Sequence, residues 1–142
     1  MLTLVCLTAC ASGIDESTAA PEATIAVADT RLGLAGRLNT RLERLGWNLT
    51  AYQTGREAGL ETPPPPDLAT RARYRLVLRA AEIGTCAGNL DTAYVYDIRL
   101  IDNRDGRVLV DRSGRGCETD IADRFQARLR QIGLLPPGAD GE

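Results

Sequence analysis

The fold is decided by one stretch of chain, which reads TAYVYDIRLID at 92–102, NRDG at 103–106 and RVLVDR at 107–112. Apolar side chains recur at every second position of 92–102, which is the period of a β-strand with one buried face. The residues at 103–106 favour a tight hairpin turn, so 107–112 is predicted to run back beside the first strand. We expect the buried face of this hairpin to carry Tyr94, Tyr96, Ile98, Leu100, Val108 and Val110.

The segment 73–83 shows the same alternation and predicts a third strand. The strands 73–83, 92–102 and 107–112 therefore form an antiparallel meander, followed by a loop at 114–116. On the third strand, one face carries Tyr74, Leu76, Leu78 and Ala80, and the other carries Arg75, Val77 and Arg79.

Two short strands and a helix are predicted in the first half of the domain. The run 24–28 is β-type, Asp29 or Thr30 is expected to cap the helix, and 47–52 forms the next strand. Leucines spaced three and four positions apart predict the helix, and Gly46 is placed to end it. This stripe comprises Leu34, Leu38, Leu42 and Leu45.

A second helix begins at Thr119 or Asp120 and stops at Gly133, before Pro136. The order of elements is thus β-α-β-loop-β-β-β-α. Since both helices have a stripe that can cover one face of a mixed sheet, we expect an α/β (α+β) two-layer sandwich with both helices on that face. The stripe of this last helix comprises Ile121, Phe125, Leu129 and Ile132.

The long connection 54–72 has no clear periodicity and contains the proline run Pro63–Pro66. Consecutive prolines favour polyproline II and break helices and sheets. A connection of this length is typical of a binding loop or a spacer, so a partner contact and a rigid spacer both stay open.

The composition excludes several classes of function. The 142 residues fit one domain, and a net charge of -2, with arginine as the only basic residue type, offers no cationic field for nucleic acid. The absence of histidine removes histidine-based nucleophile pairs and zinc sites. The acidic pairs Asp91/Asp97 and Asp102/Asp105 fit neither a glycosidase pocket nor a calcium loop. We expect no enzyme activity, no cofactor and no metal.

The chain starts with an uncharged apolar run that stops at a cysteine. Leu7-Thr8-Ala9-Cys10 resembles the lipobox of bacterial lipoproteins. The resemblance implies that 1–9 are signal peptide and that Cys10 receives a diacylglycerol and a fatty acyl chain such as palmitate. Because no Asp follows the cysteine, it also implies the periplasmic face of the outer membrane. The alternative is a buried strand at 2–7 with an ordinary thiol at Cys10.

The apolar run is short and lacks basic residues, which predicts either a translation start further upstream or a truncated sequence. Segment 10–23 holds too few apolar residues to fold, so we expect a flexible tether. The domain then spans 24–135, and 136–142 form a disordered tail.

Cys86 and Cys117 are the cysteines left in the mature domain. An even pair in an exported protein suggests a disulfide. The meander also places both residues after strands that run in the same direction, on either side of 92–102. The alternative is a redox pair, but catalytic dithiols usually have Cys-x-x-Cys spacing.

The domain as a whole, Thr24 to Ile132, resembles small α/β modules of outer-membrane-associated lipoproteins. The matching stretches are TIAVA at 24–28, LERLGW at 42–47, YRLVLRA at 74–80 and YDIRLIDNRDGRVL at 96–109. The plan is similar to the curli-secretion lipoprotein, the lipoprotein activator of peptidoglycan synthases and the amino-terminal domain of the Tol translocation protein. The resemblance implies an assembly factor or activator without a catalytic site.

Arginine gathers on two predicted surfaces. Arg37, Arg41 and Arg44 lie beside the leucine stripe of the first helix. On the sheet face away from the helices, arginine is mixed with apolar side chains, as in protein interfaces. The alternative is a solvated face on which Asp97 and Asp111 pair with the arginines. The candidate partner-binding residues are Arg75, Val77, Arg79, Val95, Arg99 and Ile101, with Leu109 beside them.

These patterns predict a non-enzymatic, lipid-anchored protein of the cell envelope that docks or helps to assemble a periplasmic or outer-membrane protein. The alternative is a carrier or chaperone that shelters a lipid or glycolipid between sheet and helices during outer-membrane assembly. The sequence leaves the oligomeric state open.

Overall fold

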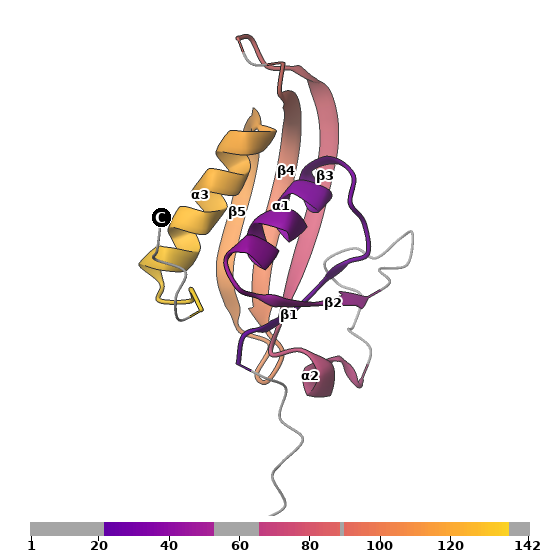
Figure 1. Cartoon of the computed structure of the whole chain (residues 1–142), viewed down its shortest axis with the longest axis vertical. Coiled ribbons are helices and arrows are strands. Elements are labelled where there is room, and N and C mark those ends of the chain that lie inside the picture. Colours follow the sequence, from indigo (N-terminus) through magenta and orange to yellow (C-terminus); the bar gives the residue numbers. More distant parts are fainter. Residues whose placement is uncertain (1–21, 53–65, 89, 137–142) are drawn as a thin grey trace, which may run out of the picture.

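A five-stranded mixed sheet lies at the centre of the protein (Figure 1). The computed structural model describes residues 22–52, 66–88 and 90–136. The sheet has the order β2-β1-β3-β4-β5, with β1 parallel to β2 and β3, and with β3, β4 and β5 antiparallel in succession. The strands are β1 (Thr24–Ala28), β2 (Asn48–Tyr52), β3 (Tyr74–Thr85), β4 (Thr92–Asp102) and β5 (Val108–Cys117).

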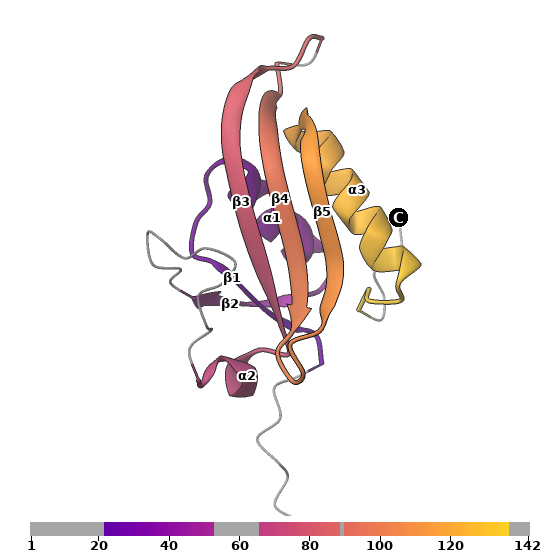
Figure 2. The same ribbon diagram turned by 180° about the vertical axis from the view of Figure 1, so that it is seen from behind.

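Two helices, α1 (Gly33–Arg44) and α3 (Glu118–Gln131), cover the same face of the sheet (Figure 1). Figure 2 shows the opposite face, on which β3, β4 and β5 carry no described helix and the short α2 (Leu68–Arg71) lies toward one end. The predicted α+β sandwich with both long helices on one face is confirmed. The sequence did not indicate α2.

One apolar cluster fills the space between the sheet and the two long helices. The predicted stripes are confirmed, since Leu38 and Leu129 are fully buried at their centres. Full burial of such a side chain contributes about 1.5–3 kcal/mol, so the stripes fix both helices to the sheet. On the opposite face, Leu68 of α2 packs with Ala26 of β1 and Ala72 in a smaller cluster.

Both long helices end at a glycine with positive φ. At Gly46 (φ +86°), the next amide, of Trp47, donates to the carbonyl of Leu42 at 3.1 Å. At Gly133 (φ +70°), the amide of Leu134 donates to the carbonyl of Leu129 at 2.9 Å. These six-to-one bonds define Schellman motifs, and they confirm the predicted helix ends.

The predicted start of α1 is wrong, because Leu32, and neither Asp29 nor Thr30, holds the N-cap position. The main chain at Arg31 lies so close to Gly36 that a Cβ there would stand 2.2 Å from the Arg31 carbonyl carbon. Residues 29–32 are therefore a link packed against the helix, and α1 begins only at Gly33.

Strand β5 is longer than the predicted 107–112. Residues 114–116, expected to form a loop, pair with Tyr94, Val95 and Tyr96 of β4. The two glycines suit this packing, because a Cβ at Gly116 would already lie 3.3 Å from Ile121 of α3. The prediction of a loop here is wrong.

A bulge near the start of β5 changes which side chains face the core. The register shifts between Leu100 and Ile101 of β4. Leu100 pairs with Val110, whereas Ile101 pairs with Val108. One extra residue reverses the facing of the side chains beyond it. Val110 is buried as predicted, but Val108 is 45% exposed and Leu109 packs against the core instead, so both predicted facings were wrong.

Several predictions lie outside the described residues. They concern the signal peptide with its lipobox, Cys10, the tether as far as residue 21, the prolines 63–65 and the tail from 137 onward. Across the described ranges, no helix is long and apolar enough to span a membrane.

Candidate docking surface

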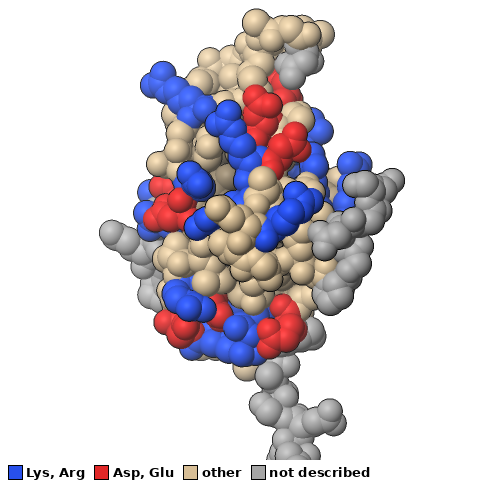
Figure 3. Space-filling view, turned by 90° about the vertical axis from the view of Figure 1, so that its left-hand side faces the viewer, with Lys and Arg blue, Asp and Glu red and all other residues tan. Residues whose placement is uncertain are grey.

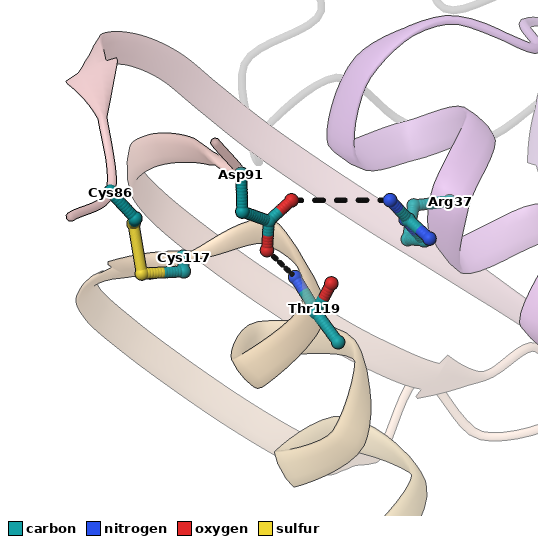
Figure 4. The surroundings of a disulfide bond; sticks show 5 residues. All are labelled: Arg37, Cys86, Asp91, Cys117 and Thr119. Carbon is teal, nitrogen blue, oxygen red and sulfur yellow. Dashed lines mark hydrogen bonds and ion pairs between the residues drawn. A yellow bond between two sulfur atoms is a disulfide. The ribbon is translucent and has the colours of Figure 1, made fainter. Parts of the chain in front are cut away.

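The disulfide predicted between Cys86 and Cys117 is present (Figure 4). The two Cα atoms are 6.0 Å apart, and the bond joins the residue after β3 to the last residue of β5. Both strands pair with β4, so the bond spans the width of the meander at one end. It closes a loop over a separation of 31 residues, which stabilises the fold by roughly 3–4 kcal/mol in the chain-entropy model.

Asp91 lies beside this disulfide and connects it to the helices (Figure 4). One carboxylate oxygen accepts the Thr119 amide at 2.8 Å in the first turn of α3, and the other lies 3.9 Å from Arg37 of α1. The Thr119 amide holds the pKa of Asp91 below its usual range, against the opposing effect of burial. This carboxylate therefore caps α3 and carries its charge in the folded protein.

A buried ion pair closes the other end of the meander. Arg73 donates to both carboxylate oxygens of Asp102, at 2.9 and 3.1 Å, and also to Glu22, which in turn accepts from Arg104. The guanidinium of Arg73 lies 5.2 Å from the ring centre of Tyr74. The network thus connects the residues just before β1 and β3 to the hairpin between β4 and β5.

Asp102 is 2% exposed, yet it stays charged. Burial by itself would raise the pKa of Asp102, but the hydrogen bonds from Arg73 and from the Arg104 amide outweigh it and hold the pKa below its usual range. A buried carboxylate with this many donors has a structural role.

The candidate face consists of side chains from β3, β4 and β5 that point away from the long helices. The strand register aligns Val77 with Arg99 and Asp111, and the next row aligns Arg79 with Asp97 and Ser113. The candidate residues Arg75, Val77, Arg79, Val95 and Arg99 therefore share one face of the sheet, the face that is turned toward the viewer in Figure 2.

Arg99, at the centre of this face, is neutralised by neighbours. Its Nε lies 3.4 Å from Asp111 and 3.7 Å from Asp97. Both contacts are longer than a good charge-assisted hydrogen bond. At this residue the geometry matches the solvated-face alternative, in which acidic neighbours pair with the arginines.

The remaining candidates differ in how much surface they offer. Arg75 donates to Asn103 at 2.9 Å, whereas Arg79 is exposed and makes no ion pair with any described residue. Val95 is 39% exposed. Ile101 is 6% exposed, so it offers little surface to a partner, contrary to expectation. The open part of the face is therefore the half around Arg79 and Val95.

The arginines of α1 serve mainly to connect helices. Arg41 donates to Asp123 at 2.7 Å and to Gln126 at 2.8 Å on α3, and Arg37 lies 3.4 Å from Glu118. Arg44 remains exposed. This row of side chains holds α1 beside α3 and is a weaker candidate for a partner.

A groove that was not predicted from the sequence lies between β5 and α3. The groove has a volume of about 500 Å³, with apolar side chains at its base and three arginines, Arg112, Arg124 and Arg128, among its lining residues. Figure 3 shows this side of the molecule, on which basic side chains lie over the middle part, with acidic side chains and uncharged surface between them. The arginines come from β5 and α3, which follow one another in the chain, and the packing of α3 beside β5 brings them to the same groove.

The acidic pairs considered from sequence are not brought together as catalytic pairs. Asp105 accepts the Arg107 amide at 2.9 Å in the hairpin turn, while Asp102 is held by Arg73. Asp91 and Asp97 lie six positions apart on one extended segment, which separates them by roughly 20 Å. The described ranges contain no cluster of three or more acidic or cysteine side chains that could hold a metal ion.

No protein-family model and no curated protein sequence matches this chain. The resemblance to envelope lipoproteins therefore stays a prediction that depends on the quoted stretches of sequence.

Proposed function

We propose that this protein is a non-enzymatic, lipid-anchored docking protein of the bacterial cell envelope. In this proposal Cys10 carries the lipid, and the folded domain faces the periplasm from the outer membrane. The observation that carries the proposal is the sheet face of β3, β4 and β5, which α1 and α3 leave uncovered and on which Arg79 and Val95 are exposed.

The disulfide supports the choice of compartment. Disulfides persist in oxidising surroundings such as the periplasm and are rare in the cytosol. Cys86 and Cys117 are bonded across the end of the meander, in a position where they stabilise the sheet.

The mixed character of the exposed half supports docking. Arginine beside apolar side chains is a common composition of interface centres, because the long stem buries apolar surface while the guanidinium forms hydrogen bonds. Arg79 has no ion-pair partner within the described part of the chain, so its charge is available to an acidic group of another protein.

The alternative function, a lipid carrier, has less support, because it was predicted to hold the lipid between the sheet and the long helices. The space between the sheet and the long helices is occupied by packed side chains, among them Leu38, Phe125 and Leu129. A lipid carrier generally needs a cavity there that can take an acyl chain.

The anchor is tested by intact mass and membrane fractionation in a Gram-negative host, with the gene expressed together with the genomic sequence that precedes it. The wild type is expected in the outer membrane with the added mass of a lipid, and Cys10→Ala is expected to be soluble and unmodified. Soluble, unmodified wild type would overturn the lipid anchor.

The docking face is tested in cells with a photo-crosslinking residue at Val95. Leu32, which is 82% exposed, provides a matched control position on another part of the surface. We expect a discrete protein adduct from position 95 that disappears in the Arg79→Glu background, and none from position 32. Equal adducts from both positions, or one that survives Arg79→Glu, would reject this face as the docking surface.

A further inference from the structure

The edge of the sheet at β5 is open to another strand. In the described part of the chain β5 pairs only with β4, so the backbone groups along its other side, over Val108–Cys117, have no strand partner. An exposed edge of this kind is a template for an added strand, which can come from a peptide of another protein.

Helix α3 extends past this edge (Figures 1 and 2). A strand added beside β5 would therefore lie under α3, with every second side chain directed into the groove between them. The base of that groove is formed by Tyr96, Ile98, Ile121 and Phe125. Strand addition would thus bury apolar surface and complete the layer beneath α3.

Glycine keeps this part of the edge accessible. At Gly114 of β5 a Cβ would lie 3.6 Å from the hydroxyl oxygen of Tyr96, which lines the groove, so the missing side chain leaves that part of Tyr96 uncovered. Glycine within a strand often marks a place where another backbone approaches closely.

The charges of the groove select the kind of strand. Arg112, Arg124 and Arg128 line it, and no acidic side chain does. Arg128 donates to Gln131, and neither Arg112 nor Arg124 makes an ion pair with a residue in the described ranges. Three cations around a partly apolar groove repel one another until an anion binds, and carboxylates match the planar guanidinium well.

A second copy of this chain is a poor occupant. Pairing two β5 edges would bring the Arg112 and Arg115 side chains of one copy toward those of the other, and like charges across strands are destabilising. An anionic lipid would neutralise the arginines but would leave the backbone groups of β5 without partners.

We propose that an extended, acidic peptide segment of a partner protein adds as a sixth strand beside β5 and places alternate carboxylates in the groove, against Arg112, Arg124 and Arg128. This inference rests on the proposed docking function, for which it names the chemistry of a partner, but it concerns different residues from the face around Arg79 and Val95.

The test uses the full chain with Cys10→Ala, screened against a random library of peptides about as long as the ten residues of β5. Selected peptides are expected to carry Asp or Glu at alternate positions. Fluorescence anisotropy then measures the affinity of one labelled binder, together with a version in which Gln replaces Glu and another with a central proline. Both versions are expected to bind at least about tenfold more weakly, because one loses the charge and the other a backbone donor.

The groove variant is Arg112→Glu with Arg128→Glu, and the charge-matched control is Arg31→Glu with Arg44→Glu, both exposed positions outside the groove. The groove variant is expected to lose binding by more than about tenfold and the control to keep it. If the double variant fails to fold, Arg124→Gln on the exposed side of α3 serves instead. Hydrogen exchange of the β5 amides is expected to slow in the complex.

Three results would overturn the proposal. The first is a library that yields no acidic binder, and the second is an affinity that neither the central proline nor the groove substitutions lower. The third is that laurate competes for the groove while no peptide slows hydrogen exchange of the β5 amides. The last result would assign the groove to an anionic lipid. These measurements use purified protein and substitute no residue of the face around Arg79 and Val95. They can therefore fail while crosslinking from position 95 succeeds, and they can succeed while that crosslinking fails.

Discussion

At one end of the meander Cys86 and Cys117 join β3 to β5 covalently, whereas at the other end Arg73 and Asp102 join the start of β3 to the end of β4 by charge. The covalent bond acts mainly by restricting the unfolded chain, and it is insensitive to acid. The ion pair is buried, so it depends on the protonation of one carboxylate and on every donor around it. The two ends should therefore be weakened by different treatments. A reductant should break the disulfide at one end, and acid should protonate Asp102 at the other.

The largest effect is expected from removing the disulfide. Cys86→Ser with Cys117→Ser should lower the free energy of unfolding by roughly 3–4 kcal/mol, because the loop that the bond closes regains its entropy in the unfolded state. Urea denaturation of the variant and of the wild type, each with and without dithiothreitol, measures this change. A variant as stable as the oxidised wild type would show that the bond contributes nothing to the fold.

A somewhat smaller loss is expected at the opposite end from Asp102→Asn. Removing one member of a buried ion pair generally costs about 3–5 kcal/mol. Arg73 keeps Glu22 and its contact with the Tyr74 ring, so we expect about 2–3 kcal/mol. Urea denaturation at neutral pH measures the loss, with Asp105→Asn in the exposed turn as the control. A loss no greater than that of the control would contradict a structural role for the pair.

Acid should separate the two ends. The pKa of Asp102 is lowered in the folded protein, so its contribution to stability is present above the ordinary aspartate pKa of about 3.9 and is lost as the pH falls through the lower, folded value. Thermal unfolding measured from pH 7 to pH 2 should show that the melting temperature of the wild type exceeds that of Asp102→Asn, and that this difference narrows below about pH 4. The difference in melting temperature between the wild type and the cysteine variant should change little over the same pH range. A difference in melting temperature between the wild type and Asp102→Asn that stays constant across this range would argue against the charged pair.

The smallest effect is expected at Asp91, which adds a charge-based contact to the disulfide end. Asp91→Ala removes the acceptor for the Thr119 amide and should lower the melting temperature, by less than Asp102→Asn does. Asp91→Asn keeps an oxygen acceptor and loses the charge opposite Arg37, so its melting temperature should lie between those of wild type and Asp91→Ala. Equal melting temperatures for the two variants would mean that the charge, and not the helix cap, is what stabilises this end.

The same contrast separates what could be predicted from what could not. The cysteine pair, the strand alternation at 92–102 and the leucine stripe of α1 are local patterns, and each led to a correct structural statement. The pairing of Arg73 with Asp102 joins residues 29 positions apart, and no spacing rule marks it.

The register of β5 shows a different limit of prediction. The alternation in 107–112 fits either facing of Val108, because a bulge inserts one residue without changing the composition of the strand. The burial of Ile101 and the exposure of Val108 depend on that shift and on the neighbours that the strands acquire.

For this protein the sequence alone determined the order of the five strands and the two long helices along the chain, the helix stops at Gly46 and Gly133, and the bonded cysteines, because each depends on residues close in sequence or on residue type. Tertiary structure alone decided which arginines are neutralised and which remain open. Arg99 acquires Asp111 from the next strand, whereas Arg112 and Arg124 meet no described acidic group in the groove beside β5. Charge pairing depends on distances across the fold, and those distances exist only after the chain has packed.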